Sequence, residues 1–206
     1  MTRVPLPESV RAARVVAVMR GIGTDRGVDV ADAARSGGVE VFEVTMDSPD
    51  APRTIETLAS GGHIVGAGTV LSINDAKGAS ASGARFLVSP HTDERVVGWA
   101  TESGHAIVPG GYTPTEIVTA WELGASAVKL FPASVGGPPF VRAVSGPLGH
   151  IPLMVTGGID ATNIASYLSA GAFSAGVGGW LVGGKDLDQV QRRSKQLAEA
   201  VISVDV

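Results

Sequence analysis

The chain has 206 residues, of which 44% are hydrophobic and 17% are charged, and it contains no cysteine. These values are typical of one folded globular unit with a sizeable core, and they exclude a disordered chain, a disulfide scaffold and thiolate chemistry. The formal net charge is -4 and no long basic run occurs, so neither nucleic acid nor an anionic membrane surface is an expected partner.

The four histidines are scattered without the spacing of a metal site, so we expect neither a metal nor a cofactor. Residues 1–8 lack the charged-then-apolar pattern of a secretion signal, and the chain has no apolar run of roughly 18 residues. We therefore expect a cytoplasmic protein without a membrane partner.

One theme repeats along the chain: a short apolar run, a joint rich in Gly, Pro, Ser or Thr, and an Ala-rich amphipathic stretch. Strands that alternate with helices predict right-handed βαβ units and a parallel sheet. Eight units at this spacing predict an α/β fold, a single compact (β/α)8 barrel (TIM barrel) over residues 1–206. The predicted strands are Val15–Met19, Val39–Val44, His63–Ala67, Arg85–Ser89, Ala106–Pro109, Ala127–Phe131, Ile151–Val155 and Phe173–Val177.

A doubly wound open sheet is the competing architecture. That fold usually carries a Gly-x-Gly-x-x-Gly loop after its first strand and an acidic residue about 20 positions later. Residues 20–26, which follow the first predicted strand, do not supply this loop. The barrel is therefore the favoured prediction.

Three helices are predicted individually. Asp160 and Asn163 offer N-cap side chains before a helix over Ile164–Ser169, which Gly171 ends. Thr113, Pro114 and Glu116 have the spacing of a capping box with proline at the first helical position, and Gly124 ends this helix. An amphipathic closing helix is predicted over Leu187–Val201.

Lys129 is the only charged residue between Glu122 and Arg142, and it lies in an apolar run that Pro132 closes. Inside a barrel its amine would be withdrawn from water, which favours the uncharged form, a nucleophile toward carbonyl carbon. The alternative is an edge-strand lysine whose amine extends to solvent. The local sequence alone does not decide between the two.

Glu43 is an acidic residue near the end of another apolar strand. Burial there would favour its protonated form and suit it to general acid and base catalysis near neutral pH. The alternative is a carboxylate paired with Arg20 or Lys129 for structure alone.

Two glycine joints follow the last two predicted strands, where barrels of this kind carry their chemistry. Gly157 and Gly158 follow the seventh strand, and Gly178 and Gly179 follow the eighth. Glycine lets the backbone approach a ligand closely, so the two joints predict a phosphate cradle. Simple tight turns are the alternative.

Eight regions spread nearly end to end combine into one distinctive pattern. They are Val15–Gly21, Glu43–Thr45, Gly66–Val70, Ser89–Pro90, Pro109–Gly110 with Thr113–Glu116, Lys129–Pro132, Thr156–Gly158 and Gly178–Trp180. In this order and spacing they resemble the class I aldolases of the 2-keto-3-deoxy-6-phosphogluconate (KDPG) and 4-hydroxy-2-oxoglutarate group, including the 2-dehydro-3-deoxy-6-phosphogalactonate aldolases.

The resemblance implies a Schiff-base mechanism. Lys129 would add to the C2 ketone of a phosphorylated 2-keto-3-deoxy sugar acid, and cleavage between C3 and C4 would give pyruvate and glyceraldehyde 3-phosphate. Glu43 would move the protons. The resemblance also implies a homotrimer that acts on a small molecule without a cofactor.

The resemblance further implies the residues that bind the substrate. Thr69 and Pro90 match positions that line the carboxylate and imine region, and Gly158 and Gly179 match the phosphate loops. The full expected set is Arg20, Thr45, Thr69, Pro90, Phe131, Gly157, Gly158, Gly178 and Gly179.

The chain departs from the family's pattern at two of these places. Asp47 stands where KDPG-type members usually carry an arginine that binds the substrate carboxylate, so Arg20 is the expected anion ligand. Gly179 stands where serine is common, so the preferred sugar acid stays open.

Two other functions compete with the aldolase. One is a phosphosugar epimerase, isomerase or decarboxylase on the same barrel, with Glu43 and Lys129 as acid and base and no covalent intermediate. The other is a phosphate-ligand binder without catalysis.

Overall fold

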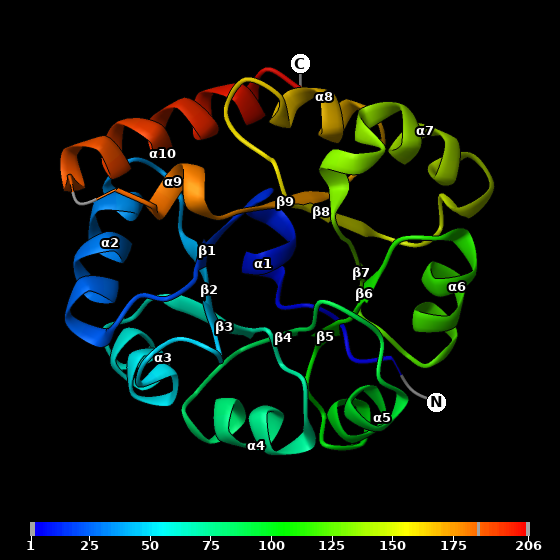
Figure 1. Cartoon of the computed structure of the whole chain (residues 1–206), viewed down its shortest axis with the longest axis horizontal. Coiled ribbons are helices and arrows are strands. Elements are labelled where there is room, and N and C mark those ends of the chain that lie inside the picture. Colours follow the sequence, from blue (N-terminus) through cyan, green and yellow to red (C-terminus); the bar gives the residue numbers. More distant parts are fainter. Residues whose placement is uncertain (1–2, 185, 205–206) are drawn as a thin grey trace.

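A ring of parallel strands surrounded by helices makes up the computed structural model, which describes residues 3–184 and 186–204 (Figure 1). The strands are β1 (Val15–Met19), β2 (Val41–Thr45), β3 (Ile64–Gly68), β4 (Leu87–Val88), β5 (Ile107–Val108), β6 (Gly110–Gly111), β7 (Val128–Leu130), β8 (Leu153–Thr156) and β9 (Ser174–Val177). The helices are α1 (Glu8–Ala12), α2 (Thr24–Ser36), α3 (Ala51–Ser60), α4 (Ile73–Ala81), α5 (Glu94–Glu102), α6 (Pro114–Glu122), α7 (Gly137–Leu148), α8 (Ile164–Ser169), α9 (Gly179–Val182) and α10 (Leu187–Ile202), with a 3-10 turn at Ala133–Val135.

The strand order β5-β4-β3-β2-β1-β9-β8-β7-β6 confirms the predicted (β/α)8 barrel. The fifth strand was predicted to end at Pro109, but it extends to Gly111 and is divided at Pro109, since proline has no N–H to donate to a ladder. Its first half, β5, pairs with β4, and its second half, β6, pairs with β7. The Pro109 carbonyl accepts a hydrogen bond from the Lys129 N–H at 2.9 Å. This divided strand therefore closes the ring.

The predicted helices are present. Helix α8 has the predicted bounds, but its N-cap residue Asn163 makes no side-chain cap hydrogen bond. The Thr113 side chain accepts a hydrogen bond from the Glu116 N–H, and the Glu116 carboxylate accepts one from the Thr113 N–H, which is the predicted capping box of α6. Helix α10 ends at Ile202, one residue beyond the prediction. The start of β2 at Val41 lies two residues later than predicted.

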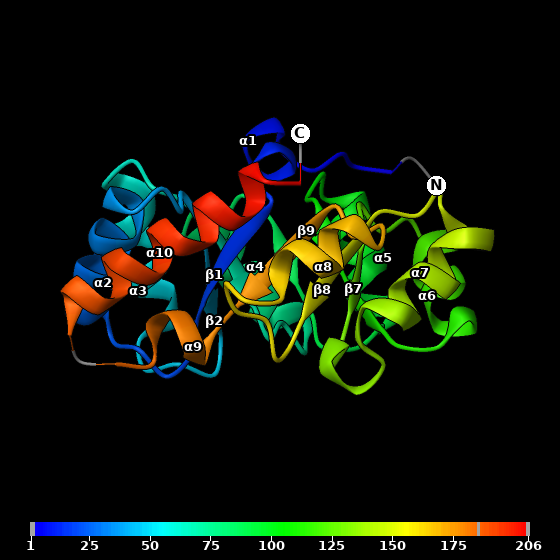
Figure 2. The ribbon, with the colours of Figure 1, turned by 90° about the horizontal axis from the view of Figure 1, so that it is seen from above.

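Alternate strand residues divide the core into two layers. One layer fills the barrel interior, and its members include Val16, Val41, Phe86 and Met154. The other layer packs between the barrel and the helices. Helix α1 lies across the end of the barrel where the strands begin, so the opposite end is the one left open for a ligand (Figure 2).

Candidate active site

Strand alternation places Lys129 and Glu43 inside the barrel. Ala127, two residues before Lys129, packs in the interior layer, whereas Val128 and Leu130 pack in the outer layer. Val41 is likewise in the interior layer, two residues before Glu43. Since successive side chains on a strand point to opposite faces, both ionisable side chains point inward. The alternative of a lysine that extends to solvent is wrong.

The Lys129 and Glu43 side chains lie close together and are both buried. The Lys129 Nζ lies 3.9 Å from the Glu43 Oε1, and the two side chains are 5% and 0% exposed. This distance is too long for a direct hydrogen bond. Among the described residues, neither carboxylate oxygen of Glu43 has a hydrogen-bond partner. A carboxylate without such a partner can exchange a proton with a group bound at Lys129.

Gly68 makes the space that the Glu43 carboxylate occupies. A Cβ atom at this position would overlap the Glu43 carboxyl group. In the sequence, Gly68 stands out only as part of the segment Gly66–Val70. Gly68 ends β3, the strand that pairs with β2, and β2 carries Glu43. The register of these two strands brings Gly68 beside the Glu43 side chain, and the sequence alone does not give that register.

A cavity of about 600 Å³ opens at the carboxyl ends of the strands, above Lys129. Every residue of the expected substrate-binding set except Thr45 lines it. The other lining residues are Val18, Thr156, Ile159, Asp160, Gly176 and Trp180, which the sequence analysis did not assign to the site. Of these, Thr156 carries a buried hydroxyl without a hydrogen-bond partner among the described residues.

Thr45 is not among the residues that line this cavity. Its side chain is fully buried, and its hydroxyl lies 3.0 Å from the Ser48 hydroxyl. This hydrogen bond holds the loop after β2, and a contact between Thr45 and the substrate stays a prediction.

The two glycine joints lie along one wall of the cavity. Gly157 and Gly158 have φ angles of +98° and +74°, which only glycine adopts without strain. The Asn163 side chain donates a hydrogen bond to the Gly158 carbonyl at 2.8 Å and holds this turn. On the other joint, Arg193 donates to the Trp180 carbonyl. The phosphate role of these joints stays a prediction.

Arg20 lies at the rim of the cavity. Its Nη1 is 2.5 Å from the Asp47 Oδ2, and its Nη2 donates to the Thr69 hydroxyl at 2.9 Å. Thr69 has a φ of +54°, which is an outlier for a β-branched residue. Such strain persists where the surrounding structure imposes it, and it is common at functional sites.

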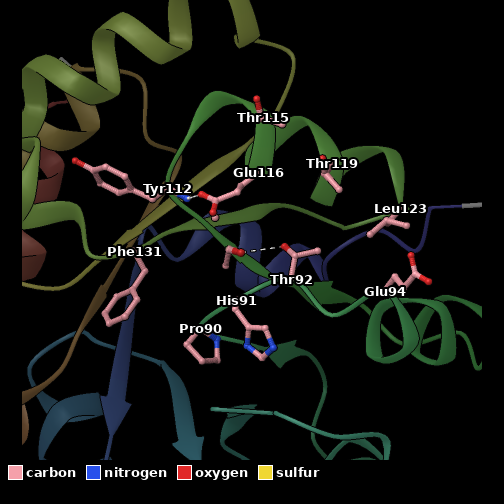
Figure 3. A pocket seen from close by; sticks show the side chains of 12 residues that line it. Pro90, His91, Thr92, Glu94, Tyr112, Thr115, Glu116, Thr119, Leu123 and Phe131 are labelled. Carbon is pink, nitrogen blue, oxygen red and sulfur yellow. Dashed lines mark hydrogen bonds between the residues drawn. The ribbon is translucent and has the colours of Figure 1, made fainter.

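A second cavity of about 480 Å³ adjoins the first between the tops of α5 and α6. Phe131 and Pro90 line both cavities. In Figure 3 they lie on one side of the second cavity, and Thr119 and Leu123 lie on the opposite side. The Phe131 ring lies 5.3 Å from the Lys129 Nζ. Phe131 and Pro90 therefore form the wall between the catalytic cavity and its neighbour.

In the part of the chain that the structure describes, no group of three or more His, Cys, Asp or Glu side chains could hold a metal ion. None of the described helices combines the length and the apolar character needed to cross a bilayer.

The fold and the site together define a class of protein: a (β/α)8-barrel enzyme in which a buried lysine can form an imine with a ketone while an adjacent carboxylate moves protons. The family model "KDPG and KHG aldolase" matches residues 6–195. The chain belongs to this family, whose members are aldolases, which are carbon-carbon lyases.

Curated relatives match over most of their length. The chain is 36% identical to the probable 2-dehydro-3-deoxy-6-phosphogalactonate aldolase of Rhizobium meliloti, a match that covers 86% of this chain and 85% of the relative. It is 34% identical to the 2-dehydro-3-deoxy-phosphogluconate aldolase of Treponema pallidum, which covers 94% and 96%.

Solved structures also match over most of this chain. A cube-shaped protein cage, designed by fusing symmetric oligomeric domains, contains a chain that superposes with a TM-score of 0.88 at 29% identity, over 94% of this chain and 74% of that one. The KDPG aldolase of Legionella pneumophila, with pyruvate captured as a covalent carbinolamine intermediate, has a TM-score of 0.80 at 28% identity, over 95% and 96%.

Proposed function

We propose that this protein is a Schiff-base (class I) aldolase. It reversibly cleaves a 2-keto-3-deoxy-6-phospho sugar acid, the gluconate or the galactonate epimer, to pyruvate and glyceraldehyde 3-phosphate. The single observation that carries the proposal is the buried Lys129 amine, 3.9 Å from a Glu43 carboxylate that makes no hydrogen bond to a described residue. The names of the relatives support the substrate class.

The reaction uses these two groups in sequence. The Lys129 Nζ attacks the C2 ketone and water leaves, which gives a protonated imine. A base removes the proton of the C4 hydroxyl, the C3–C4 bond breaks with its electrons moving into the imine, and an aldehyde leaves. The resulting enamine takes a proton at C3, and water then releases pyruvate and the free amine. Glu43 is the carboxylate within reach of these transfers.

The two anionic ends of the substrate have separate places along the cavity. Arg20 and Thr69 lie on the side of β1 and β3, where we assign the carboxylate of the oxo acid. The joints Gly157–Gly158 and Gly178–Gly179 lie after β8 and β9, where we assign the phosphate. Backbone N–H groups at such joints bind phosphate without a basic side chain.

Reductive trapping tests the proposal. Borohydride added with pyruvate should attach a three-carbon adduct to Lys129, which peptide mass spectrometry locates, and should abolish aldol cleavage. Lys129→Met should give no adduct, whereas Lys77→Met, at an exposed lysine on α4, should be trapped like the unaltered protein. An adduct elsewhere, or turnover that survives borohydride, would favour an epimerase or isomerase that uses the same residues without covalency.

We also propose that the protein acts as a homotrimer in the cytoplasm. The trimer is supported by the family resemblance and by an apolar groove of about 670 Å³ between α6 and α7, which a second copy could cover. Light scattering in solution would test it, since a monomer of 20.9 kDa is readily distinguished from a trimer.

A further inference from the structure

The turn that carries Arg20 is held by the loop after β2. The Gly21 N–H donates to the Ser48 hydroxyl at 2.8 Å, and that hydroxyl in turn lies 3.0 Å from the Thr45 hydroxyl. Ser48 and Thr45 are both buried. Asp47, in the same loop, contacts the Arg20 guanidinium at 2.5 Å. One loop thus fixes both the backbone and the side chain of the Arg20 turn.

The loop after β3 holds the other side of the guanidinium. The Arg20 Nη2 donates to the Thr69 hydroxyl at 2.9 Å, and Thr69 keeps the left-handed φ of +54°. Its neighbours are pinned, because the Gly68 carbonyl accepts from the Met46 N–H at 2.8 Å and the Val70 N–H donates to the Val88 carbonyl at 3.1 Å. The guanidinium is therefore gripped between two loops.

An exposed ion pair of this kind adds little to folding stability, because solvent screens both charges. Arg20 and Asp47 are 56% and 49% exposed. A long arginine side chain at a cavity rim also loses much rotamer freedom when it is fixed. The contact with Asp47 therefore matters more for the orientation of the Arg20 guanidinium than for stability. A guanidinium has five N–H donors in a rigid fork, and those that Asp47 and Thr69 do not use remain for a ligand.

We propose that Asp47 is a positioning residue that orients Arg20 toward the carboxylate of the bound oxo acid. Asp47 does not touch the substrate; it fixes the direction of the Arg20 fork before the substrate arrives, which lowers the entropy that binding would otherwise cost. This proposal rests on the proposed function. It further assigns the Arg20 end of the cavity to the pyruvate half of the substrate rather than to its phosphate.

Exchange of the C3 hydrogens of pyruvate in D2O, followed by proton NMR, isolates that half of the reaction, because pyruvate carries the carboxylate but no phosphate. Asp47→Ala should raise the KM for pyruvate about tenfold, the effect of losing one charge-assisted hydrogen bond, with kcat changed less than about threefold. Asp47→Asn keeps an acceptor oxygen and should recover most of this loss.

A double-mutant cycle shows whether Asp47 acts through Arg20. Arg20→Gln should itself raise the KM, and Asp47→Ala should then add no further effect, because the group it orients is gone. Glu199→Ala is the control, since it removes one member of an exposed ion pair with Lys195 on α10. The melting temperatures of Asp47→Ala and Glu199→Ala should both stay within about 2 °C of the unaltered protein.

Three results would overturn the proposal. A lower KM for pyruvate in Asp47→Ala would mean that Asp47 masks the charge of Arg20 instead of orienting it. A full effect of Asp47→Ala in the Arg20→Gln background would mean that Asp47 acts without Arg20. If Asp47→Ala left pyruvate exchange unchanged and raised the KM only for the phosphorylated sugar acid, Arg20 would belong to the phosphate site. If the unaltered protein neither exchanged nor trapped pyruvate, the aldolase itself would be refuted.

Discussion

At the scale of single residues, the site depends on space as much as on charge. The Lys129 amine and the Glu43 carboxylate lie 3.9 Å apart, and no side chain of Gly68 intervenes. Burial of a carboxylate without a hydrogen bond is costly. The described part of the chain carries this cost at Glu43, beside the buried amine of Lys129, which is where a proton acceptor serves an imine reaction.

Gly68→Ala tests whether that space matters. The new methyl group would push the Glu43 carboxylate aside, and a displacement of about 1 Å at a reacting group can lower a rate about a hundredfold, so we expect a kcat loss of that order. Circular dichroism should show an intact fold, because the φ of Gly68 is not among the positive φ angles of the chain's glycines.

The matched control for this substitution is Gly98→Ala on helix α5. A Cβ at Gly98 meets no atom within 4 Å, so alanine there should leave aldol cleavage unchanged. Full activity of Gly68→Ala would show that the position of the Glu43 carboxylate is not critical.

At the scale of elements, the strands orient the catalytic side chains and the helix caps hold the loops beyond them. The capping box of α6 is an example, because its Glu116 side chain binds both the Tyr112 N–H at 2.9 Å and the Thr113 N–H at 2.8 Å. These two residues follow β6, and Tyr112 lines the cavity next to Phe131 (Figure 3). The cap therefore fixes the loop at the wall that the two cavities share.

The cap should make stability depend on pH. The Thr113 and Tyr112 N–H groups lower the pKa of Glu116 in the folded protein, so its contribution is present above the unfolded pKa and is lost as the pH falls through the folded pKa. Glu116→Gln should lower the melting temperature at pH 7, and the difference should narrow below about pH 4.

Thermal melts from pH 3 to pH 7 would measure this narrowing. Glu122→Gln, on the last turn of the same helix, is the control and should show no such cap-dependent change. A constant difference between Glu116→Gln and the unaltered protein across the range would contradict the assigned role of the carboxylate.

At the scale of the whole molecule, the two ends of the barrel have different tasks. Leu6 and Val10 pack on the interior layer. Val10 belongs to α1, which lies across the end of the barrel where the strands begin (Figure 2). The catalytic cavity opens at the other end. Stability and catalysis should therefore be separable by substitution, as is general for this fold.

Leu6→Ala tests that separation. Removing a buried leucine side chain should lower the free energy of unfolding by about 2 to 5 kcal/mol, while kcat at a temperature below the melting transition should change less than about twofold. Ile202→Ala, at an exposed position on α10, should alter stability by less than about 0.5 kcal/mol. A large loss of kcat in folded Leu6→Ala would show that the two ends are coupled.

Local sequence patterns determined much of this protein. The repeated strand and helix signals were sufficient for the (β/α)8 barrel, and Thr113, Pro114 and Glu116 were sufficient for the α6 cap, because periodicity and capping depend on near neighbours. The segments around Lys129 and Glu43 likewise indicated the family. Pro109 was visible too, although its division of the fifth strand was not foreseen.

Only the tertiary structure decided which way Lys129 points, how far it lies from Glu43, and why Gly68 is glycine. It also placed the Thr45 hydroxyl beside that of Ser48 and paired Asp47 with Arg20. Each of these contacts joins different strands or loops, so each depends on the register and closure of the ring. The order of residues along the chain does not give the distances between such positions, and the site depends on these distances.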